Sequence, residues 1–127
     1  MTEQIRRFQP EDFDQIHRLN ELEGWQDLVA DQERTREAWI SANAAYVLEY
    51  DGQVVAYVRA LTDGFVTTYV CELLVSREAR KQGYGQQLLD HLQHTYPTRI
   101  DLLATRQSAP FYEEQGFRAF HGFRKSR

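Results

Sequence analysis

The fold of this chain is decided by an apolar run, Val70-Cys71-Glu72-Leu73-Leu74-Val75, the loop Arg80-Lys81-Gln82-Gly83-Tyr84-Gly85, and a polar stretch after it that carries Leu88, Leu89 and Leu92. The apolar run predicts a β-strand, and the leucine spacing predicts an α-helix. A chain that turns through glycines from a strand into a helix points backbone N–H groups at one spot, with the positive end of the helix dipole behind them. The stretch therefore predicts an anion site, most often one for phosphate, with Arg80 and Lys81 beside it.

Two common phosphate loops are excluded by single positions. A dinucleotide fingerprint needs a third glycine where this chain has Leu88, and a Walker A loop needs Lys-Ser/Thr where Gly85 is followed by Gln86. The remaining pattern is R-x-x-G-x-G between a strand and a helix. An alternative interpretation is a plain connection in which Gly83 and Gly85 only turn the chain.

This loop resembles the acyl-CoA pyrophosphate loop of the GNAT superfamily of N-acyltransferases. A second stretch, Phe111-Tyr112-Glu113-Glu114-Gln115-Gly116-Phe117, is similar to the helix and Gly-Phe turn that closes the acyl-CoA site in that family. The resemblance extends over nearly the whole chain. It implies an enzyme that moves acetyl from acetyl-CoA, bound as a co-substrate, to a primary amine by direct attack.

Composition narrows the class of protein. The 127 residues are 42% hydrophobic and 27% charged, which is typical of a globular chain, and we expect one domain over residues 1–127. A net charge of −4 argues against nucleic acid as a partner. The single cysteine, Cys71, rules out an internal disulfide and fits a cytoplasmic protein. No apolar run approaches the ~20 residues of a membrane span, and we expect neither a membrane nor a metal as a partner.

Hydrophobic periodicity and turn residues predict an α/β fold with a mixed sheet and flanking helices, in the order β-α-α-β-β-β-α-β-α-β, which is also the GNAT order. Pro10 opens the first helix, Gly24 ends it, and Asp51-Gly52 joins two strands as a hairpin. The expected strands are Ile5–Phe8, Ala45–Tyr50, Val54–Leu61, Phe65–Val75, Arg99–Ala104 and Phe117–Phe123. The expected helices are Glu11–Glu23, Gln32–Ala42, a helix from the glycine loop to about Tyr96, and Pro110–Gln115.

The resemblance also assigns contacts to the co-substrate. The backbone amides of Gln82, Gly83, Tyr84, Gly85 and Gln86 are expected to bind the pyrophosphate, with Arg80 and Lys81 adding charge. The amides of Leu73 and Val75 are expected to hold the acyl carbonyl and the pantetheine arm. Thr105 and Ser108 stand where the family often has Asn and Ala, which weakens a second contact to CoA.

Glu72 is expected to act as a general base or as an acceptor contact. It interrupts an apolar strand, and desolvation of an unpaired carboxylate raises its proton affinity. A base is needed because alkylamines titrate near ~10 and arrive protonated at neutral pH. The alternative is a salt bridge across the sheet to an arginine such as Arg59.

Tyr112 matches the tyrosine that protonates the departing CoA thiolate in many members of the family. The alternative is an aromatic packing residue beside Phe111. Trp25 borders the acceptor site by the same resemblance, or packs as a buried tryptophan. Cys71 has no histidine partner in view, so we expect an inert thiol.

Two other functions stay open at this point. The chain is a catalytically silent acyl-CoA-binding or sensor module if the catalytic groups are idle, or a regulator that binds nucleotides lacking pantetheine. The acceptor is not fixed by the sequence: a small amine, an amino acid, a polyamine, a peptide or a protein lysine all fit. A homodimer is expected, because the short C-terminal part leaves an edge strand unpaired.

Overall fold

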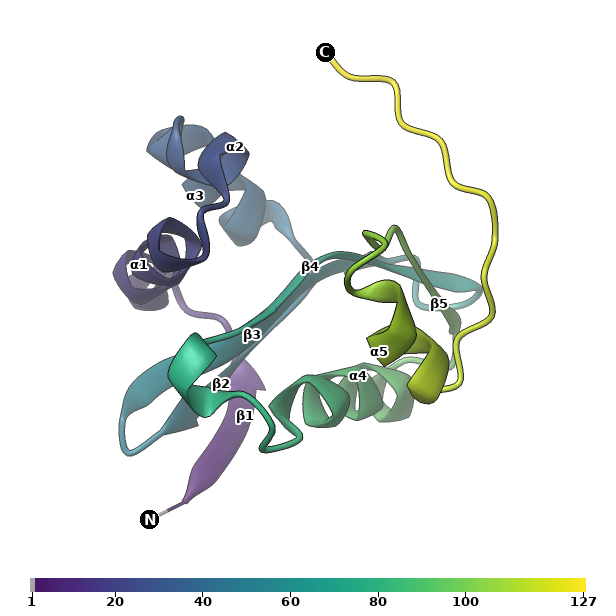
Figure 1. The fold of residues 1–127 in the computed structure, drawn as a ribbon. Coiled ribbons are helices and arrows are strands. Elements are labelled where there is room, and N and C mark those ends of the chain that lie inside the picture. Colours follow the sequence, from purple (N-terminus) through teal and green to yellow (C-terminus); the bar gives the residue numbers. More distant parts are fainter. Residues whose placement is uncertain (1) are drawn as a thin grey trace.

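The computed structural model describes residues 2–127, whose strands form a five-stranded mixed sheet (Figure 1). The strands occupy the sheet in chain order, and all neighbours are antiparallel except β4 and β5, which are parallel. The α/β fold class with a mixed sheet is confirmed. The bounds are β1 (Glu3–Arg7), β2 (Ala44–Tyr50), β3 (Gln53–Thr62), β4 (Thr67–Val75) and β5 (Arg99–Leu102).

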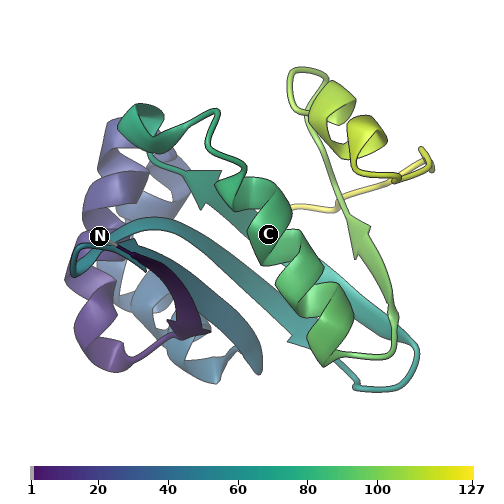
Figure 2. The same cartoon turned by 90° about the horizontal axis from the view of Figure 1, so that it is seen from below.

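Helices cover both faces of the sheet (Figures 1 and 2). α1 and α3 lie on one face, while α4 and α5 lie on the other. A short helix, α2, follows α1 in a segment for which no helix was predicted. The helical bounds are α1 (Phe13–Glu23), α2 (Gln26–Val29), α3 (Gln32–Ser41), α4 (Tyr84–Thr95) and α5 (Ala109–Glu114), with 3₁₀ turns at Pro10–Asp12 and Arg77–Ala79.

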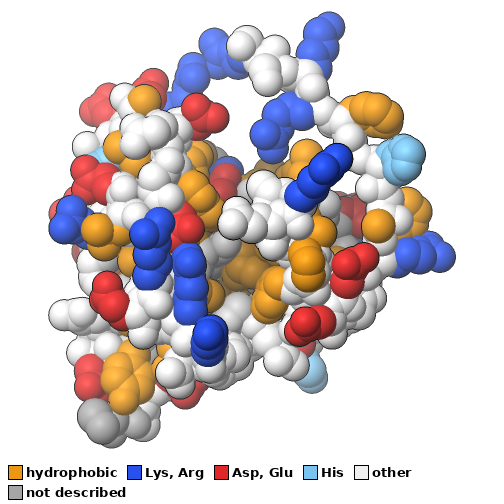
Figure 3. Space-filling view, viewed as in Figure 1, with side chains coloured by type: hydrophobic (Ala, Val, Ile, Leu, Met, Phe, Trp, Pro, Cys, Tyr) orange, Lys and Arg blue, Asp and Glu red, His pale blue; other side chains and the backbone are white. Residues whose placement is uncertain are grey.

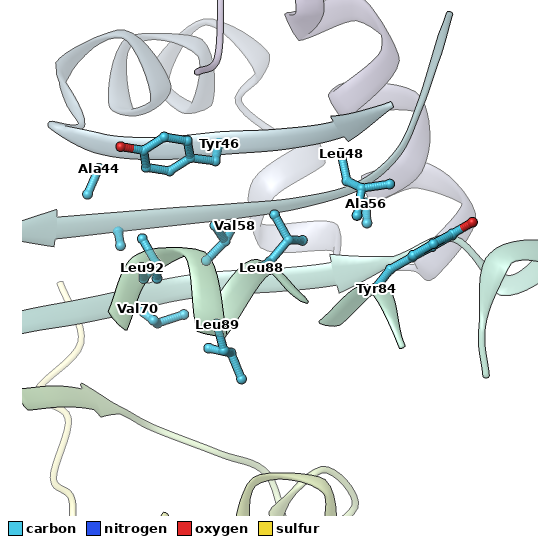
Figure 4. Packing of buried hydrophobic residues seen from close by; sticks show 11 residues of the cluster. Ala44, Tyr46, Leu48, Ala56, Val58, Val70, Tyr84, Leu88, Leu89 and Leu92 are labelled. Carbon is cyan, nitrogen blue, oxygen red and sulfur yellow. The ribbon is translucent and has the colours of Figure 1, made fainter. Parts of the chain in front are cut away.

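Each face of the sheet carries its own apolar cluster. Leu88, Leu89 and Leu92 of α4 are buried against the strands, as the leucine spacing predicted (Figure 4). On the other face, Phe13 and Ile16 of α1 pack with Trp39 of α3. Burial of each such side chain contributes about 1.5–3 kcal/mol, so these two clusters fix the helices to the sheet.

Local turn chemistry explains the correctly predicted boundaries. Gly24 ends α1 with φ of 82°, and Asp51 and Gly52 both have positive φ between β2 and β3, as a tight hairpin requires. β4 begins later than expected, at Thr67, because the Asp63 carboxylate accepts hydrogen bonds from the amides of Phe65, Val66 and Thr67. These bonds lower the pKa of Asp63 and hold residues 63–66 as a loop.

The prediction of a last strand over Phe117–Phe123 is wrong. These residues run without regular structure past the outer edge of β5, with Gly122 against the Leu103 side chain, and none of the described strands pairs with them. β5 is also shorter than predicted, since it ends at Leu102 where its pairing with Val70 of β4 ends. Within residues 2–127, no helix combines the length and the apolar character needed to cross a bilayer.

Candidate functional site

β4 and β5 separate halfway along β4. Their parallel pairing runs from Thr67 opposite Arg99 to Val70 opposite Leu102, and the rest of β4 continues with only β3 beside it. The register with β3 shifts at the same place, because Arg59 pairs with Glu72 while Ala60 pairs with Val70, which leaves Cys71 as an extra residue. Such a bulge bends a strand, so it accounts for the divergence from β5.

The open side of β4 presents backbone groups of Leu73 and Val75. The Ser76 amide donates to Val55 of β3 (2.8 Å), and backbone groups along a strand alternate in direction, so the groups of Val75 and Leu73 point away from β3. The Val75 carbonyl accordingly accepts a hydrogen bond from Arg80 Nε (3.0 Å) rather than from β3. The two amides chosen from the sequence therefore share the opening.

The glycine loop ends at the N-terminus of α4, as predicted. Gly83 is the residue before the helix, with φ of 81°, and no side chain in the described part of the chain caps it. The amides of Tyr84, Gly85 and Gln86 belong to the first turn, where N–H groups have no partner within the helix. They stay available to an anion, and the loop starts one residue after the 3₁₀ turn that follows β4.

The two glycines of the loop have different roles. Gly83 takes a left-handed conformation, but Gly85 does not. A Cβ on Gly85 would lie 3.1 Å from Phe111 Cζ and 3.8 Å from a Val75 methyl carbon. Gly85 therefore lets α5 approach α4 beside the end of β4, and the Tyr84 side chain is buried in the core instead of facing the loop.

Arg80 is held by protein groups on two sides. Its Nη2 donates to Glu23 Oε1 at the end of α1 (2.6 Å), and its Nε donates to the Val75 carbonyl. Lys81 is exposed and has φ of 67°. Both basic residues of the loop are exposed, but Arg80 is held by Glu23 and Val75 and must change partners to reach an anion.

Glu72 is paired, which corrects the expectation of an unpaired buried carboxylate. Arg59 Nε donates to Glu72 Oε1 (2.6 Å) and Arg59 Nη2 donates to Oε2 (2.8 Å), and each side chain is 15% exposed. The alternative interpretation, a salt bridge across the sheet, is confirmed. The pairing does not test the catalytic role of Glu72, which stays a prediction.

Tyr112 lies on α5 among aromatic rings, with Phe111 at 5.0 Å and Phe117 at 5.6 Å between ring centroids. Burial raises the pKa of Tyr112, so its hydroxyl keeps its proton at neutral pH and remains a donor. The packing interpretation is thus correct for the ring, while the role of the hydroxyl stays a prediction. Phe111 ties this helix to Gly85 and so to the loop.

Thr105 and Ser108 bond to each other before α5. The Thr105 amide donates to Ser108 Oγ (3.1 Å), the Ser108 amide donates to Thr105 Oγ1 (3.1 Å), and the two hydroxyls lie 3.0 Å apart. This reciprocal pattern fixes the start of the helix. Contact of either side chain with CoA stays a prediction.

A polar cluster on the α1 face was missed by the sequence analysis. Tyr57 of β3 donates to Asn20 Oδ1 of α1 (2.5 Å), and both side chains are buried. Burial raises the pKa of Tyr57, and the charges of Glu72 and Glu23 raise it further. An apolar strand with one tyrosine carries no signal that its hydroxyl meets an asparagine 37 residues away. Burial likewise raises the pKa of the Cys71 thiol, consistent with an inert group.

The face shown in Figure 3 is hollowed between α1–α3 on one side and α5 on the other. Hydrophobic side chains lie at the bottom of the hollow, and basic side chains gather along its rim near the loop before α4. A diverging strand pair beside a helix N-terminus suits an elongated ligand with an anionic group.

The family model described as "Acetyltransferase (GNAT) family" matches residues 6–117, and the chain belongs to that family. Many solved structures share the fold. A GNAT-family acetyltransferase from Streptococcus pneumoniae has a TM-score of 0.75 and 19% identity, with 99% of this chain and 98% of that chain covered. No curated protein sequence matches this chain.

Two further solved structures resemble this chain over nearly its whole length. The PaiA N-acetyltransferase of Thermoplasma acidophilum, solved in complex with coenzyme A, has a TM-score of 0.75 and 15% identity over 93% of this chain and 91% of that chain. An aminoglycoside acetyltransferase from an uncultured soil sample has a TM-score of 0.75 and 14% identity over 100% and 99%. At these identities the likeness shows the shared fold.

Proposed function

We propose that this protein, as one catalytic domain over residues 1–127, transfers acetyl from acetyl-CoA to a primary amine by direct attack, without a covalent enzyme intermediate. The observation that carries the proposal is the opening between β4 and β5, where the Leu73 and Val75 amides face the same side as the N-terminus of α4. Family membership supports acyl transfer from CoA. The aminoglycoside acetyltransferase among the structural relatives supports an amine acceptor.

In this mechanism the pyrophosphate binds the amides of Gln82–Gln86, with Lys81 and Arg80 adding charge, and the pantetheine arm runs along β4. The Leu73 amide donates to the acyl carbonyl, where negative charge develops during attack. The amine nitrogen forms a bond to the carbonyl carbon, the carbon–sulfur bond breaks, and Tyr112 donates a proton to the thiolate. Positioning supplies most of the rate, since it removes an entropic barrier that can reach about 7–11 kcal/mol.

Glu72 acts on the acceptor's proton. Both of its carboxylate oxygens accept hydrogen bonds from Arg59, so a proton must compete with the guanidinium for the same oxygens. We therefore favour transfer through a water molecule oriented by the Arg59–Glu72 pair over direct contact. The proton that Glu72 takes from the acceptor is then released to solvent.

The loop assignment is tested by Gly83→Asp, which places a carboxylate among amides poised for an anion. Gly83 has open space around its Cβ position, and Asp tolerates a left-handed conformation better than most residues, so we expect the fold to survive. Calorimetry should show loss of CoA binding. The matched control is Gly52→Asp, because Gly52 also has a positive φ (80°) and open space around its Cβ position, but lies in the β2–β3 turn. Unchanged CoA affinity in Gly83→Asp overturns the assignment.

The Arg59–Glu72 pair also favours a second candidate, a silent acyl-CoA-binding or sensor module, because the proposed base is already engaged. Thiol release from acetyl-CoA with a panel of amines separates the two: the enzyme releases CoA, and the module binds CoA without turnover. Nucleotides that lack pantetheine bind only if the protein is a phosphate-binding regulator.

Location and assembly complete the proposal. We place the protein in the cytoplasm, where acetyl-CoA and a reduced Cys71 coexist. We also propose a homodimer, because the outer edge of β5 has no strand partner among residues 2–127.

A further inference from the structure

Glu23, the last residue of α1, lies between two arginines of the segment that follows β4. Its Oε1 lies 2.6 Å from Arg80 Nη2 and 3.8 Å from Arg77 Nε, and its side chain is 19% exposed. α1 ends here because Gly24 turns the chain in a left-handed conformation. The end of α1 and the entrance of the glycine loop are thus joined through one carboxylate.

Arg80 is the member of this group that can change partners. It precedes the amides at the start of α4 by a few residues, its Nε is bonded to the Val75 carbonyl at the end of β4, and its side chain is 45% exposed. An anion at those amides competes with Glu23 for the same guanidinium. A pyrophosphate is the stronger competitor, since it carries more than one negative charge and accepts bidentate arginine bonds.

Glu23 also borders the polar cluster on the α1 face. Asn20, one helical turn before it, holds the Tyr57 hydroxyl, and the negative charge of Glu23 acts on Tyr57 together with that of Glu72. Asn20 is fully buried, and its Nδ2 has no partner within the described residues. Glu23 and the Arg59–Glu72 pair therefore both lie within electrostatic range of Tyr57.

We propose that Glu23 is the specificity-determining carboxylate for the acceptor: it binds a second cationic group of the amine, at a position that Arg80 occupies until acyl-CoA draws Arg80 away. The inference rests on the proposed function. Without Arg80, the partly buried carboxylate keeps only Arg77, at 3.8 Å, among the described residues, and burial of a charge favours a closer cation. Amines supply one, because they are protonated at neutral pH.

The bound group is not the attacking nitrogen. A nitrogen held in an ion pair keeps its proton and has no free lone pair for the acyl carbonyl. Glu23 is linked through Arg80 to Val75, whereas the carbonyl is placed at Leu73, two residues or about 6.5 Å away along β4. Preferred acceptors therefore carry two cationic groups separated by a short spacer, and acyl-CoA and acceptor bind with positive coupling.

CoA binding measured by calorimetry tests the exchange of partners without any need for activity. Glu23→Gln should raise the affinity for CoA about two- to fivefold, the fold-change that corresponds to losing a partly exposed ion pair. In an Arg80→Gln background the same substitution should have no effect, which separates competition for Arg80 from a general change of charge. Glu21→Gln is the matched control, because Glu21 pairs with His17 and Arg18 of its own helix.

The choice of acceptor tests whether Glu23 binds the second cationic group of the amine. With acetyl-CoA saturating, the wild type should use 1,4-diaminobutane with a higher kcat/KM than butylamine, Glu23→Gln should lose this preference, and Glu21→Gln should keep it. Equal CoA affinity in wild type and Glu23→Gln, or a diamine preference that survives Glu23→Gln, overturns the inference about Glu23 and leaves the proposed function standing. Absence of CoA binding by the wild type overturns the proposed function as well.

Discussion

At the scale of single residues, the ion pair between Arg59 and Glu72 decides how catalysis is tested. Glu72→Gln keeps the shape of the side chain and removes its charge. We expect turnover to fall with little change in acetyl-CoA affinity, and the loss to shrink as the pH approaches ~10, where free amine becomes abundant. Steady-state rates across that range measure the effect. A ratio of rates that stays flat with pH assigns Glu72 to structure or to acceptor binding instead.

The stability of the same variant supplies its control. Removal of the carboxylate leaves the largely buried Arg59 guanidinium without its partner, so the free energy of unfolding should fall by roughly 1–3 kcal/mol. A double variant, Arg59→Met with Glu72→Met, should regain stability because it removes both charges, yet it should not regain turnover. Glu78→Gln, at an exposed position after β4, should change neither quantity.

Tyr112→Phe removes the proposed acid and keeps the ring packed between Phe111 and Phe117. We expect turnover to fall by about 10²-fold, the low end for a general acid, because a thiolate with a conjugate acid near ~8.5 leaves readily. Acetyl-CoA affinity should hardly change. Tyr96→Phe, whose hydroxyl contacts Tyr46 at the other end of α4, is the control. An unchanged turnover number, with chemistry rate-limiting, removes Tyr112 from the mechanism.

The raised pKa of Tyr112 adds a pH dependence to this prediction. A general acid works in its protonated form, and burial raises the pKa of this hydroxyl above its usual value near ~10. The contribution of Tyr112 is therefore present throughout neutral and mildly alkaline pH and is lost only above the ordinary tyrosine range. The wild-type-to-Phe ratio of turnover numbers should accordingly stay constant from pH 7 to 9.

At the scale of elements, α5 is placed by a missing side chain on α4. Gly85→Ala would put a Cβ 3.1 Å from Phe111 Cζ, so the ring and its helix must shift by a few tenths of an ångström. We expect a several-fold loss of turnover, since Tyr112 moves with Phe111. Stability is a poor measure here, because alanine in a helix gains up to about 1 kcal/mol over glycine. Phe111→Leu in the same chain should restore the rate by removing the contact; a double variant as slow as Gly85→Ala would contradict this account.

The elements that the sequence predicted well are those fixed by local chemistry. The positive φ angles at Gly24 and at Asp51-Gly52 follow from the residue types and do not depend on tertiary contacts. The spacing of the leucines in α4 is enough to predict which face of the helix is buried. The prediction of a strand over Phe117–Phe123 failed because a strand requires a partner, and an aromatic-rich segment says nothing about whether one is present.

The features of the candidate site likewise fall into those set by local sequence and those that depend on residues far apart in the chain. The place of the glycine loop at the start of α4 was predicted from the sequence, since strand, loop and helix are contiguous in the chain. The amides of Leu73 and Val75 were assigned by resemblance, and their contacts with acyl-CoA stay a prediction. The bulge at Cys71, the exact partner of Glu72 and the contact of Glu23 with Arg80 depend on register and on residues far apart in sequence. Arg59 was named as one possible partner, but Glu23, 57 residues from Arg80, was not singled out.

At the scale of the whole molecule, the sheet has an open edge at β5, beside which the C-terminal segment passes. Phe120 and Phe123 are 75% and 91% exposed, and the chain after α5 passes β5 before it leads away from the sheet (Figure 1). The outer backbone groups of β5 have no strand partner within residues 2–127. Exposed aromatic side chains next to an open sheet edge favour association with a second copy. The proposed homodimer therefore uses this side.

The dimer is tested by removing the two aromatic rings together. Phe120→Ser with Phe123→Ser should convert a dimeric wild type to a monomer in sedimentation equilibrium at equal protein concentration. Phe65→Ser is the matched control: Phe65 is 83% exposed but lies in the loop between β3 and β4, so its loss should leave the dimer intact. The two variants should keep the wild-type CoA affinity, because Phe65, Phe120 and Phe123 lie outside β4 and the loop before α4. A monomeric wild type contradicts the dimer, and dissociation by Phe65→Ser moves the interface to the β3–β4 turn.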